Sequence, residues 1–351
     1  MGLEGLRKEI EDIDLQILAL MRKRLDAAER IGRIKVEENS QVRVPATEAK
    51  VIARYRDFAE ENGMDQDNAE SICRTFMQES IELQAAMPRA TGKSRDIAVV
   101  GGCGKMGHWF SELFSRAGHH VTVIDPSSDN GLTLRDASEA DTVLVSVPIS
   151  KTADVLRELD GICRDDALIF DISSLKSPLV STLRDMGSHR KVCSVHPMFG
   201  PSAKSMFDRN LVICDCGNDE ACDEAMRLLD NHGANMRRMP VEDHDRYMSY
   251  VLGLSHAVNI ALFTVLARSG IPYDDMSTVA STTFRKLMDS NVSVAMEDPD
   301  LYYEIQHLNV NRESVLHEFD RSVEDVVDAA LSDDPEKFRE LMEKGREYFS
   351  E

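Results

Sequence analysis

The strongest constraint on the fold is a helical segment at the start of the chain. Residues 12–35 contain no Pro, and no Gly before Gly32, so nothing interrupts a helix there. Apolar residues recur along residues 3–36 at the spacing of one helical face. They are Leu6, Ile10, Ile13, Ile17, Leu20, Ala27, Ile31 and Ile34. Arg24 and Lys35 stand where this apolar stripe continues, so the helix directs two cations toward a core.

The length of this helix predicts a dimer. A helix over residues 3–36 is about 51 Å long at about 1.5 Å per residue, whereas a globule of about 90 residues has a radius of gyration near 13 Å. Two shorter helices are expected at about 45–61, ending at the cap signal Asn62-Gly63, and at about 65–86. They are too short to cover the whole stripe. We therefore expect the first domain to be an intertwined dimer of three-helix chains.

Length and composition exclude several classes of partner. A chain of 351 residues predicts two or three domains, and its net charge of −21 argues against nucleic acid, which needs surplus Lys and Arg. The seven cysteines lack spaced CxxC pairs, which favours reduced thiols in the cytoplasm and no metal site. The amino terminus is charged and does not resemble a signal peptide. The apolar run 248–267 is long enough to span a membrane, but it contains His256 and Asn259, so we expect a buried helix and no membrane partner.

The period of the pattern changes after a short polar linker at 91–95. Short apolar runs predict buried strands, with helical stretches between several of them. These runs are DIAVVGG, HHVTVIDP, DTVLVSVP, DALIFDIS and KVCSVHP. This alternation is typical of a doubly wound parallel sheet over residues 96–241. From 242 to 351 only helical patterns remain. The predicted architecture is therefore multi-domain: an all-α domain (1–90), an α/β Rossmann-like domain (96–241) and an all-α domain (242–351).

A glycine-rich loop follows the first predicted strand. Gly102, Gly104 and Gly107 form a GxGxxG motif that opens a helix, and Asp125 ends the next strand 18 residues after the last Gly. In this context Gly102 permits a tight turn, Gly104 lets the backbone approach a pyrophosphate, and Gly107 allows close helix–strand packing. Asp125 would accept a ribose hydroxyl and repel a 2′-phosphate. The motif predicts a dinucleotide site that favours NAD over NADP.

Candidate catalytic residues follow later strands. His196, in HPMFGP, ends a predicted parallel strand at the edge where such sheets bind ligands, and an imidazole suits general-base work. Ser174 and Lys176 follow another strand in DISSLKSP. His256 lies in the apolar run, and Arg285 in STTFRKLM. Each has a plainer alternative: a structural His196, a capping serine, a solvated lysine, a core His256 and a surface arginine.

Taken together, these segments resemble a known enzyme family. VVGGCGKMG, DISSLKSP, VHPMFGP and LSHAVN, in this order with a helical tail, resemble the prephenate dehydrogenase family. The first ninety residues resemble the all-helical chorismate mutase domain, and the order matches the bifunctional chorismate mutase–prephenate dehydrogenases of tyrosine biosynthesis. The resemblance implies a cytoplasmic homodimer that uses NAD and dimerises through the C-terminal helical domain. Its substrates would be chorismate and prephenate, and the dehydrogenase product 4-hydroxyphenylpyruvate.

The resemblance assigns the cations of the first helix to a substrate. The mutase pattern appears as Arg7, Arg24, Lys35, Glu48, Ser80 and Gln84. In that family the two arginines hold the carboxylates of chorismate, one of them across the dimer, the lysine and the glutamine contact the ether oxygen, and the glutamate meets the ring hydroxyl. Arg24 and Lys35 share a helical face, and so do Ser80 and Gln84, whereas Arg7 lies about 100° away. Val44 stands where the family often has Asp, so we expect weakened but not lost activity.

In the dehydrogenase part, the resemblance makes His196 the acceptor of a hydrogen bond from the C4 hydroxyl of prephenate. Ser174 would approach the same hydroxyl, and His256 would line the substrate pocket. The residues implied to bind the cofactor are Gly102, Gly104, Lys105, Met106, Gly107 and Asp125.

One position departs from the dehydrogenase pattern. Family members commonly carry a substrate-binding Arg eight residues after the position of Arg285, and this chain has Ser293 there. Either Arg285 or Lys176 then binds the substrate carboxylate, or the substrate is arogenate or an amino-substituted prephenate. A protein of another class, which binds NAD and an aromatic acid only for regulation, is the third hypothesis.

Overall fold

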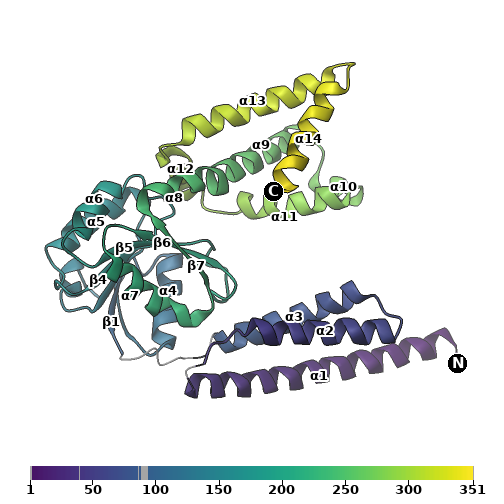
Figure 1. Cartoon of the computed structure of the whole chain (residues 1–351), viewed down its shortest axis with the longest axis horizontal. Coiled ribbons are helices and arrows are strands. Elements are labelled where there is room, and N and C mark those ends of the chain that lie inside the picture. Colours follow the sequence, from purple (N-terminus) through teal and green to yellow (C-terminus); the bar gives the residue numbers. More distant parts are fainter. Residues whose placement is uncertain (1, 39, 86, 88–93, 351) are drawn as a thin grey trace. The chain divides into compact units, whose positions relative to one another are not determined.

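The computed structural model describes every residue except 1, 39, 86, 88–93 and 351 (Figure 1). The chain divides into two compact units. The first contains Met1–Ser173 and Ser181–Pro240, and the second contains Ser174–Val180 and Val241–Glu351. The predicted linker 91–95 lies mostly outside the described residues. The short segment that carries Ser174 and Lys176 therefore belongs to the helical C-terminal unit and not to the sheet it follows.

The first unit begins with three helices, as predicted. They are α1 (Leu3–Glu37), α2 (Pro45–Glu61) and α3 (Gln66–Ala85). Pro45 occupies the first position of α2, where its missing N–H costs no helical hydrogen bond. Gly63, just past the end of α2, has a φ of 65°, which glycine adopts without strain. These signals explain why the helix boundaries are readable from the sequence.

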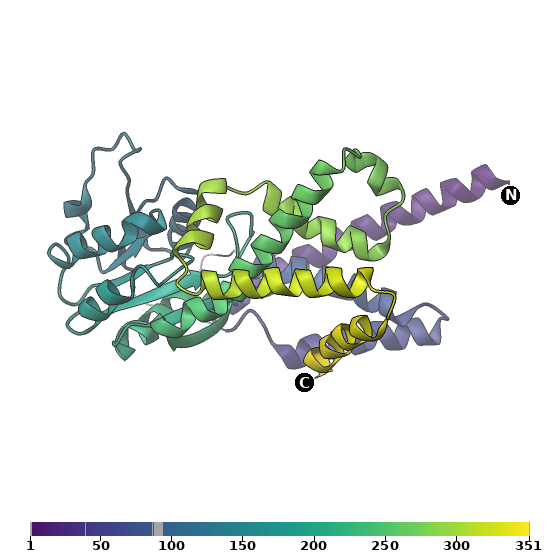
Figure 2. The same cartoon turned by 90° about the horizontal axis from the view of Figure 1, so that it is seen from above.

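The apolar face of α1 is largely uncovered in the single chain. At its amino-terminal end α1 extends beyond α2 and α3 (Figures 1 and 2), and its buried positions are Ala28 and Gly32, both near the other end. The stripe residues Leu6, Ile10, Ile13, Ile17 and Leu20 have exposed fractions from 46% to 62%. An exposed apolar face of this length needs a partner to cover it, which is consistent with the predicted dimer.

The rest of the first unit is built on a seven-stranded sheet of order β2-β1-β3-β4-β5-β6-β7. The strands are β1 (Asp96–Val100), β2 (His120–Ile124), β3 (Thr142–Val145), β4 (Leu168–Asp171), β5 (Val192–Pro197), β6 (Asn210–Asp215) and β7 (Asn235–Pro240). Strands β1 to β5 are parallel, but β5 pairs antiparallel with β6. The prediction of an all-parallel sheet is therefore wrong at this edge, where β6 and β7 were not anticipated. No helix lies between β5 and β6, so the chain returns without the crossover that parallel pairing needs.

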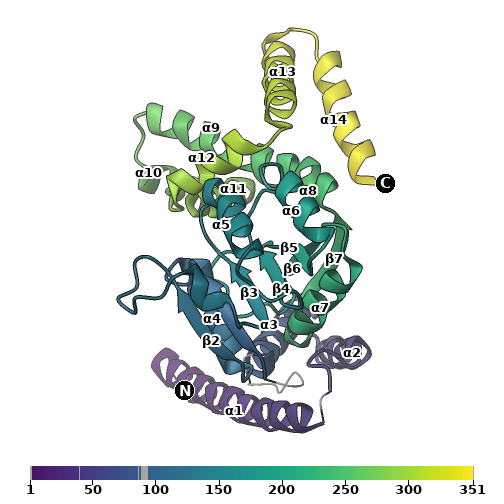
Figure 3. The ribbon, with the colours of Figure 1, turned by 90° about the vertical axis from the view of Figure 1, so that its left-hand side faces the viewer.

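Four α-helices cover the two faces of the sheet. They are α4 (Lys105–Arg116), α5 (Ile149–Asp160), α6 (Val180–Gly187) and α7 (Asp219–Leu229), with short 3₁₀ turns η1 (Leu134–Ala137) and η2 (Asp230–His232). Helices α4 and α7 lie on one face, and α5 and α6 on the other (Figure 3). Phe110 and Phe114, one turn apart on α4, are fully buried in a core with Val99 and Phe170 of the strands and Ala225 of α7. This core fixes the strand ends that carry the candidate residues.

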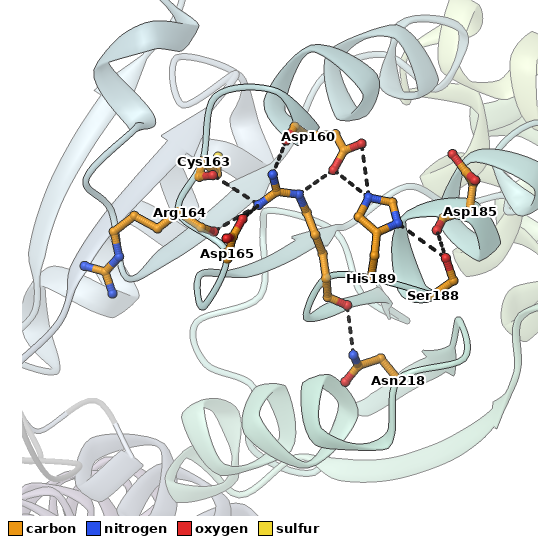
Figure 4. Close-up of polar contacts among 9 residues, drawn as sticks. Asp160, Cys163, Arg164, Asp165, Asp185, Ser188, His189 and Asn218 are labelled. Carbon is orange, nitrogen blue, oxygen red and sulfur yellow. Dashed lines mark hydrogen bonds and ion pairs between the residues drawn. The ribbon is translucent and has the colours of Figure 1, made fainter.

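Strand β5, which carries His196, is anchored at its start by Arg190. The guanidinium of Arg190 donates to the carboxylate and the carbonyl of Asp160 at the end of α5, and to the carbonyls of Cys163 and Arg164, each at 3.1 Å. His189 Nε2 lies 3.1 Å from the same Asp160 carboxylate, as Figure 4 shows. A cation at these carbonyls satisfies the end of α5 and interacts favourably with its dipole.

The second unit is helical, with an interrupted first helix. Its elements are α8 (Val241–Met248), the π-helical turn η3 (Ser249–Leu254), α9 (Ser255–Arg268), α10 (Tyr273–Thr278), α11 (Thr282–Ala295), α12 (Pro299–Leu308), α13 (Arg312–Leu331) and α14 (Glu336–Ser350). Among the described residues, Val241–Arg268 is the one helix that is long and apolar enough to cross a membrane by length and composition, which is weak evidence. Only 17% of its most apolar window is buried. The expected burial of this helix is thus not found in the single chain.

Candidate active sites

Arg24 meets the third helix, on the face that the sequence predicted. Its Nη1 donates to the hydroxyl of Ser80 and, at 2.7 Å, to the carbonyl oxygen of Phe76. The guanidinium also lies over the Phe76 ring, 5.6 Å from the ring centre. Ser80 is buried and Arg24 is half-buried. The alternative that Arg24 only reaches out to solvent is therefore wrong.

Lys35 links the last turn of α1 to the segment between α1 and α2. Its Nζ donates to the carbonyl oxygen of Val42 at 2.6 Å, and the Lys35 side chain is half-buried. Glu48, on the first turn of α2, accepts the Nε–H of Arg43, with both carboxylate oxygens 3.1 Å from that nitrogen.

Gln84 contributes a buried polar atom that no described residue satisfies. The side chain is 6% exposed, and its Oε1 has no hydrogen-bond partner among the described residues. It packs against α1 at Gly32, where an added Cβ would come within 3.0 Å of the Gln84 Cγ. Lys35 is one turn further along α1. An unsatisfied buried amide at this place is costly unless a ligand pairs with it.

Arg7 is not brought to the other predicted residues in the single chain. It is exposed, and it precedes Arg24 on the same helix by about 25 Å at about 1.5 Å per residue. A residue this distant along a straight helix cannot serve the site of Arg24 on its own chain. It is available to a second chain packed along the exposed stripe.

The glycine-rich loop has the geometry of a phosphate cradle, with one correction. The positive φ of the turn belongs to Gly101, at 80°, and not to Gly102. A Cβ on Gly101 would lie 2.2 Å from the carbonyl oxygen of Ser146, and one on Gly107 would lie 2.3 Å from that of Gly101. Gly107 therefore has the predicted role in close packing. Gly104 precedes α4, and its own N–H donates to the Gly101 carbonyl oxygen at 3.1 Å. The N–H groups of the first turn of α4 that follow it have no acceptor within the helix, which favours an anion at this end.

Asp125 is held at the mouth of this loop. Its carboxylate accepts the N–H of Cys103 at 3.0 Å, and the N–H and hydroxyl of Ser127 at 2.9 and 2.6 Å. Partial burial pushes its pKa up, but these hydrogen bonds outweigh burial and hold the pKa below its ordinary value. Asp125 is therefore an ionised acceptor beside the loop, fixed by the loop's own backbone. Lys105 and Met106 open α4 beside it, with Lys105 exposed.

His196 lies near the carboxyl end of β5, at the same sheet edge as the loop, because β1 to β5 run parallel. It is 4% exposed. Two residues earlier, on the same face of the strand, Ser194 donates to Asp171 Oδ1 at 2.5 Å. The other oxygen of Asp171 accepts the Ser173 N–H at 2.9 Å. The ends of β4 and β5 are thus tied together beside His196.

In the second unit, Ser174 and Lys176 lie on a segment held by Asp245 of α8. The Asp245 carboxylate accepts the N–H groups of Lys176 and Ser177, at 2.9 and 2.6 Å, and it also bonds the Ser177 hydroxyl and, at 2.6 Å, His244 Nδ1. Burial pushes the pKa of Asp245 up, but the bonds from His244, Ser177 and Lys176 more than offset this and keep the pKa low. Lys176 is fully buried, so its alternative as a solvated lysine is wrong.

His256 presents a second buried polar atom without a partner among the described residues, its Nδ1. The ring is 8% exposed and stacks on Tyr302 of α12 at 4.1 Å between ring centres. Burial lowers the pKa of His256 to about 4, so the imidazole is neutral at physiological pH. A neutral ring with an unsatisfied nitrogen suits the lining of a polar pocket.

Arg285 is exposed on α11, and Ser293, eight residues further along the same helix, is exposed as well. The next buried positions of α11 are Met288 and Asn291, and Asn291 Nδ2 donates to Asn259 Oδ1 of α9 at 2.9 Å. The buried side of α11 is therefore structural, and Arg285 is on an accessible surface.

Sequence reasoning missed three residues that hold the predicted ones in place. They are Arg43 beside Glu48, Asp245 beneath Lys176, and Tyr302 against His256. Lys176 and Asp245 are 69 positions apart, so no local pattern joins them. Arg43, five residues before Glu48, is the one that local sequence could have indicated.

Three family models match consecutive parts of the chain. "Chorismate mutase type II" matches residues 6–85, "Prephenate dehydrogenase, nucleotide-binding domain" matches 111–238, and "Prephenate dehydrogenase, dimerization domain" matches 240–344. Together they account for each of the three predicted parts.

Two bacterial proteins are similar to this chain over most of its length. The T-protein of Enterobacter agglomerans is 29% identical over 310 residues, which cover 86% of this chain and 81% of that protein. The T-protein of Haemophilus influenzae is 25% identical over 352 residues, which cover 100% and 93%. A crystal structure of prephenate dehydrogenase from A. aeolicus, in complex with hydroxyphenyl propionate and NAD⁺, has a TM-score of 0.56. It is 20% identical and covers 74% of this chain and 96% of that one.

Proposed function

The chain belongs to the family of bifunctional chorismate mutase–prephenate dehydrogenases, and from this premise we propose how its residues divide the two reactions. It rearranges chorismate to prephenate and oxidatively decarboxylates prephenate to 4-hydroxyphenylpyruvate with NAD, in tyrosine biosynthesis. We assign the mutase to residues 1–90, NAD binding to 96–241, and substrate binding with dimerisation to 242–351.

The mutase reaction needs a preorganised cation pocket and no nucleophile. Chorismate rearranges within one molecule, so the protein only has to hold the reactive conformer and stabilise charge on the departing ether oxygen. Arg24, fixed by Ser80, binds one carboxylate, while Lys35 and Gln84 meet the ether oxygen. The observation that carries this assignment is the place of the buried Gln84 amide, which packs against α1 at Gly32, one turn before Lys35, so that its Nε2 group can donate to the ether oxygen beside the Lys35 ammonium. Glu48 accepts the ring hydroxyl.

The mutase site is completed by a second chain. Arg7 lies too far along α1 to reach Arg24 of its own chain, and the stripe from Leu6 to Leu20 is exposed. A partner α1 packed along that stripe would bury it and bring in its own Arg7. The match of residues 240–344 to a dimerisation domain, and the uncovered apolar helix Val241–Arg268 within it, also support a homodimer. We place this homodimer in the cytoplasm.

The residues of the glycine-rich loop fit the pyrophosphate of NAD. Gly101 and Gly107 leave no room for a Cβ, so the loop backbone lies close to α4, and the N–H groups of the first turn of α4 have no acceptor within the helix. Gly102 and Gly104 shape the cradle, with Lys105 and Met106 at its rim. Asp125, ionised and held by Cys103, accepts ribose hydroxyls and repels a 2′-phosphate. When bound, NAD supplies the hydride acceptor for carbon 4 of prephenate.

His196 is the base of the dehydrogenase. It accepts the hydrogen bond of the C4 hydroxyl and takes its proton as the C4 hydrogen leaves as hydride. The ring carboxylate then departs as CO₂, its electrons complete the aromatic ring as a phenolate, and His196 returns the proton to give the phenol. We assign Ser174 a catalytic role as well, and the segment that carries it is fixed by Asp245 of the second unit. We assign His256, which is neutral and whose Nδ1 has no partner among the described residues, to substrate binding.

The substrate carboxylate is bound by Arg285. The two candidates were Arg285 and Lys176, and Lys176 is fully buried whereas Arg285 is accessible. Ser293 motivates the alternative that the dehydrogenase acts on arogenate or an amino-substituted prephenate. Comparing kcat/KM for prephenate and arogenate decides between them: we expect prephenate to be preferred, and a preference for arogenate would support the alternative.

A coupled assay tests the assignment of two sites. Purified protein is given chorismate and NAD, and NADH is followed alongside prephenate. The wild-type chain should make NADH, whereas His196→Asn should accumulate prephenate without NADH. Absence of NADH from every substrate with the wild-type chain would favour the non-catalytic, regulatory hypothesis.

A further inference from the structure

The segment between α1 and α2 contacts the NAD-binding part of the same compact unit. Val42 is buried, and its carbonyl oxygen is the acceptor of Lys35. The next residue, Arg43, donates from Nε to Glu48 and from Nη1 to Asp208, at 2.9 Å from its Oδ1. Arg43 therefore bridges a mutase carboxylate and a carboxylate on the loop between β5 and β6.

Phe207, the residue before Asp208, also packs against this bridge. Its ring is 8% exposed and packs in one apolar cluster with Val42, Ile81 and Ala85 of the mutase. The Arg43 guanidinium lies over the same ring, 5.4 Å from its centre, which is a favourable cation–π distance. Phe207 thus shares a cluster with Val42, which pairs with Lys35, and its ring lies against Arg43, which pairs with Glu48.

The loop itself is held by the NAD-binding domain. Asp208 has a φ of 54°, the only positive value at a described non-glycine residue, and its N–H donates to the carbonyl oxygen of Gly233 at 3.0 Å. Asn235 Nδ2 lies 3.3 Å from the Asp208 carboxylate. Such a backbone conformation persists only where the surroundings impose it. Asp208 is therefore presented in a fixed position that its own domain determines.

We propose that Phe207 and Asp208 of the NAD-binding domain are positioning residues for the mutase, acting through Arg43 on Glu48. They hold the Arg43 guanidinium so that the Glu48 carboxylate is oriented for the ring hydroxyl of chorismate. This inference rests on the proposed role of Glu48. It makes part of the mutase site dependent on the neighbouring domain of the same chain.

The expected effects differ between the two residues. Arg43 and Asp208 are 38% and 58% exposed, and an exposed ion pair contributes little, so Asp208→Asn should lower mutase kcat/KM only about threefold. Phe207→Ala removes a buried ring and should lower it about tenfold, because a buried aromatic side chain contributes more than an exposed pair. Phe207→Leu keeps an apolar side chain and should recover most of the loss. Prephenate oxidation should change less than about twofold in each variant.

The test is a double-mutant cycle in the full chain, with Asp166→Asn as the matched control. Asp166 pairs with Arg164 at a similar exposure in the same domain, and its variant should leave mutase activity unchanged. In a Glu48→Gln background, Asp208→Asn and Phe207→Ala should lose most of their effect on mutase kcat/KM. Thermal unfolding of each variant establishes that the fold is retained.

The outcomes separate this inference from the function on which it rests. If Glu48→Gln lowers mutase activity but Asp208→Asn and Phe207→Ala do not, the inference is overturned and the role of Glu48 stands. Equal losses with and without Glu48 would also overturn it, because the residues would then act only through stability. If Glu48→Gln has no effect, both the role of Glu48 and the inference are wrong.

Discussion

The ammonium of Lys35 lies 2.6 Å from the carbonyl oxygen of Val42. This contact fixes a cation at the end of the long first helix, one turn from the buried amide of Gln84. In the proposed mutase site this fixed ammonium meets the negative charge that develops on the ether oxygen of chorismate.

Replacing Lys35 by Ala should abolish most chorismate rearrangement and spare prephenate oxidation. Removing one preorganised donor to a developing charge costs about 10²–10³ in kcat. Arg33→Ala is the matched control, because Arg33 is an exposed cation on the same helix that pairs with Glu29. Separate assays of the two reactions check this. Loss of both activities in Lys35→Ala would contradict separable sites.

Replacing Gln84 by Glu should make the mutase dependent on pH. A protonated carboxyl can donate a hydrogen bond to the ether oxygen, but a carboxylate cannot. Burial and the negative charge of the substrate both raise the pKa of such a group. Activity of Gln84→Glu should therefore fall as pH rises, whereas the wild-type profile stays flat over the same range. Parallel pH profiles of kcat/KM for the two proteins would show that Gln84 does not face the substrate.

His256 should make the protein less stable in mild acid. Burial lowers its folded pKa to about 4, from 6.5. The unfolded chain therefore binds a proton at higher pH than the folded one, so this contribution is complete above pH 6.5 and is lost as pH falls toward 4. The loss is on the order of 3 kcal/mol at most. Urea unfolding at several pH values should show a smaller pH dependence in His256→Phe than in wild type, and equal dependences would refute the assignment.

Arg190→Met should destabilise the first unit without touching either active site. Its guanidinium is 11% exposed and satisfies several carbonyls at the end of α5 as well as the Asp160 carboxylate (Figure 4). Loss of a charged hydrogen-bonding partner should cost about 2–3 kcal/mol. Arg157 of α5 forms an exposed ion pair with Asp154 and serves as the control. Arg157→Met should change stability by less than about 0.5 kcal/mol. Urea denaturation measures both, and equal losses would contradict the role of Arg190.

Local signals explain what could be predicted of the fold. The first two helices begin and end where periodicity, Pro45 and Gly63 place them. Strand β6 was missed because its four apolar residues, Leu211 to Cys214, resemble any short buried run, and its antiparallel pairing depends on the loop before it. The turn glycine was misplaced by one residue, since only the backbone shows that Gly101 carries the positive φ.

The candidate sites were predictable where residues share one element and less so elsewhere. Ser80 and Gln84, four positions apart on α3, are both buried as expected. Asp245 and Phe207 were missed because they act on residues far away in sequence, and those contacts exist only after the chain folds. A solvated Lys176 was one alternative, but the approach of α8 buries this residue.

In the proposed dimer the cations of α1 serve a dianion held between two chains, and mixing two inactive variants tests this most directly. Arg7→Ala and Lys35→Ala, each inactive as a mutase, are unfolded together and refolded as mixed dimers. Half of the dimers should then be mixed, each with one site free of both changes, so about a quarter of wild-type mutase activity should return. No recovery, although mixed dimers form, would show that Arg7 does not act across the dimer and would contradict the account.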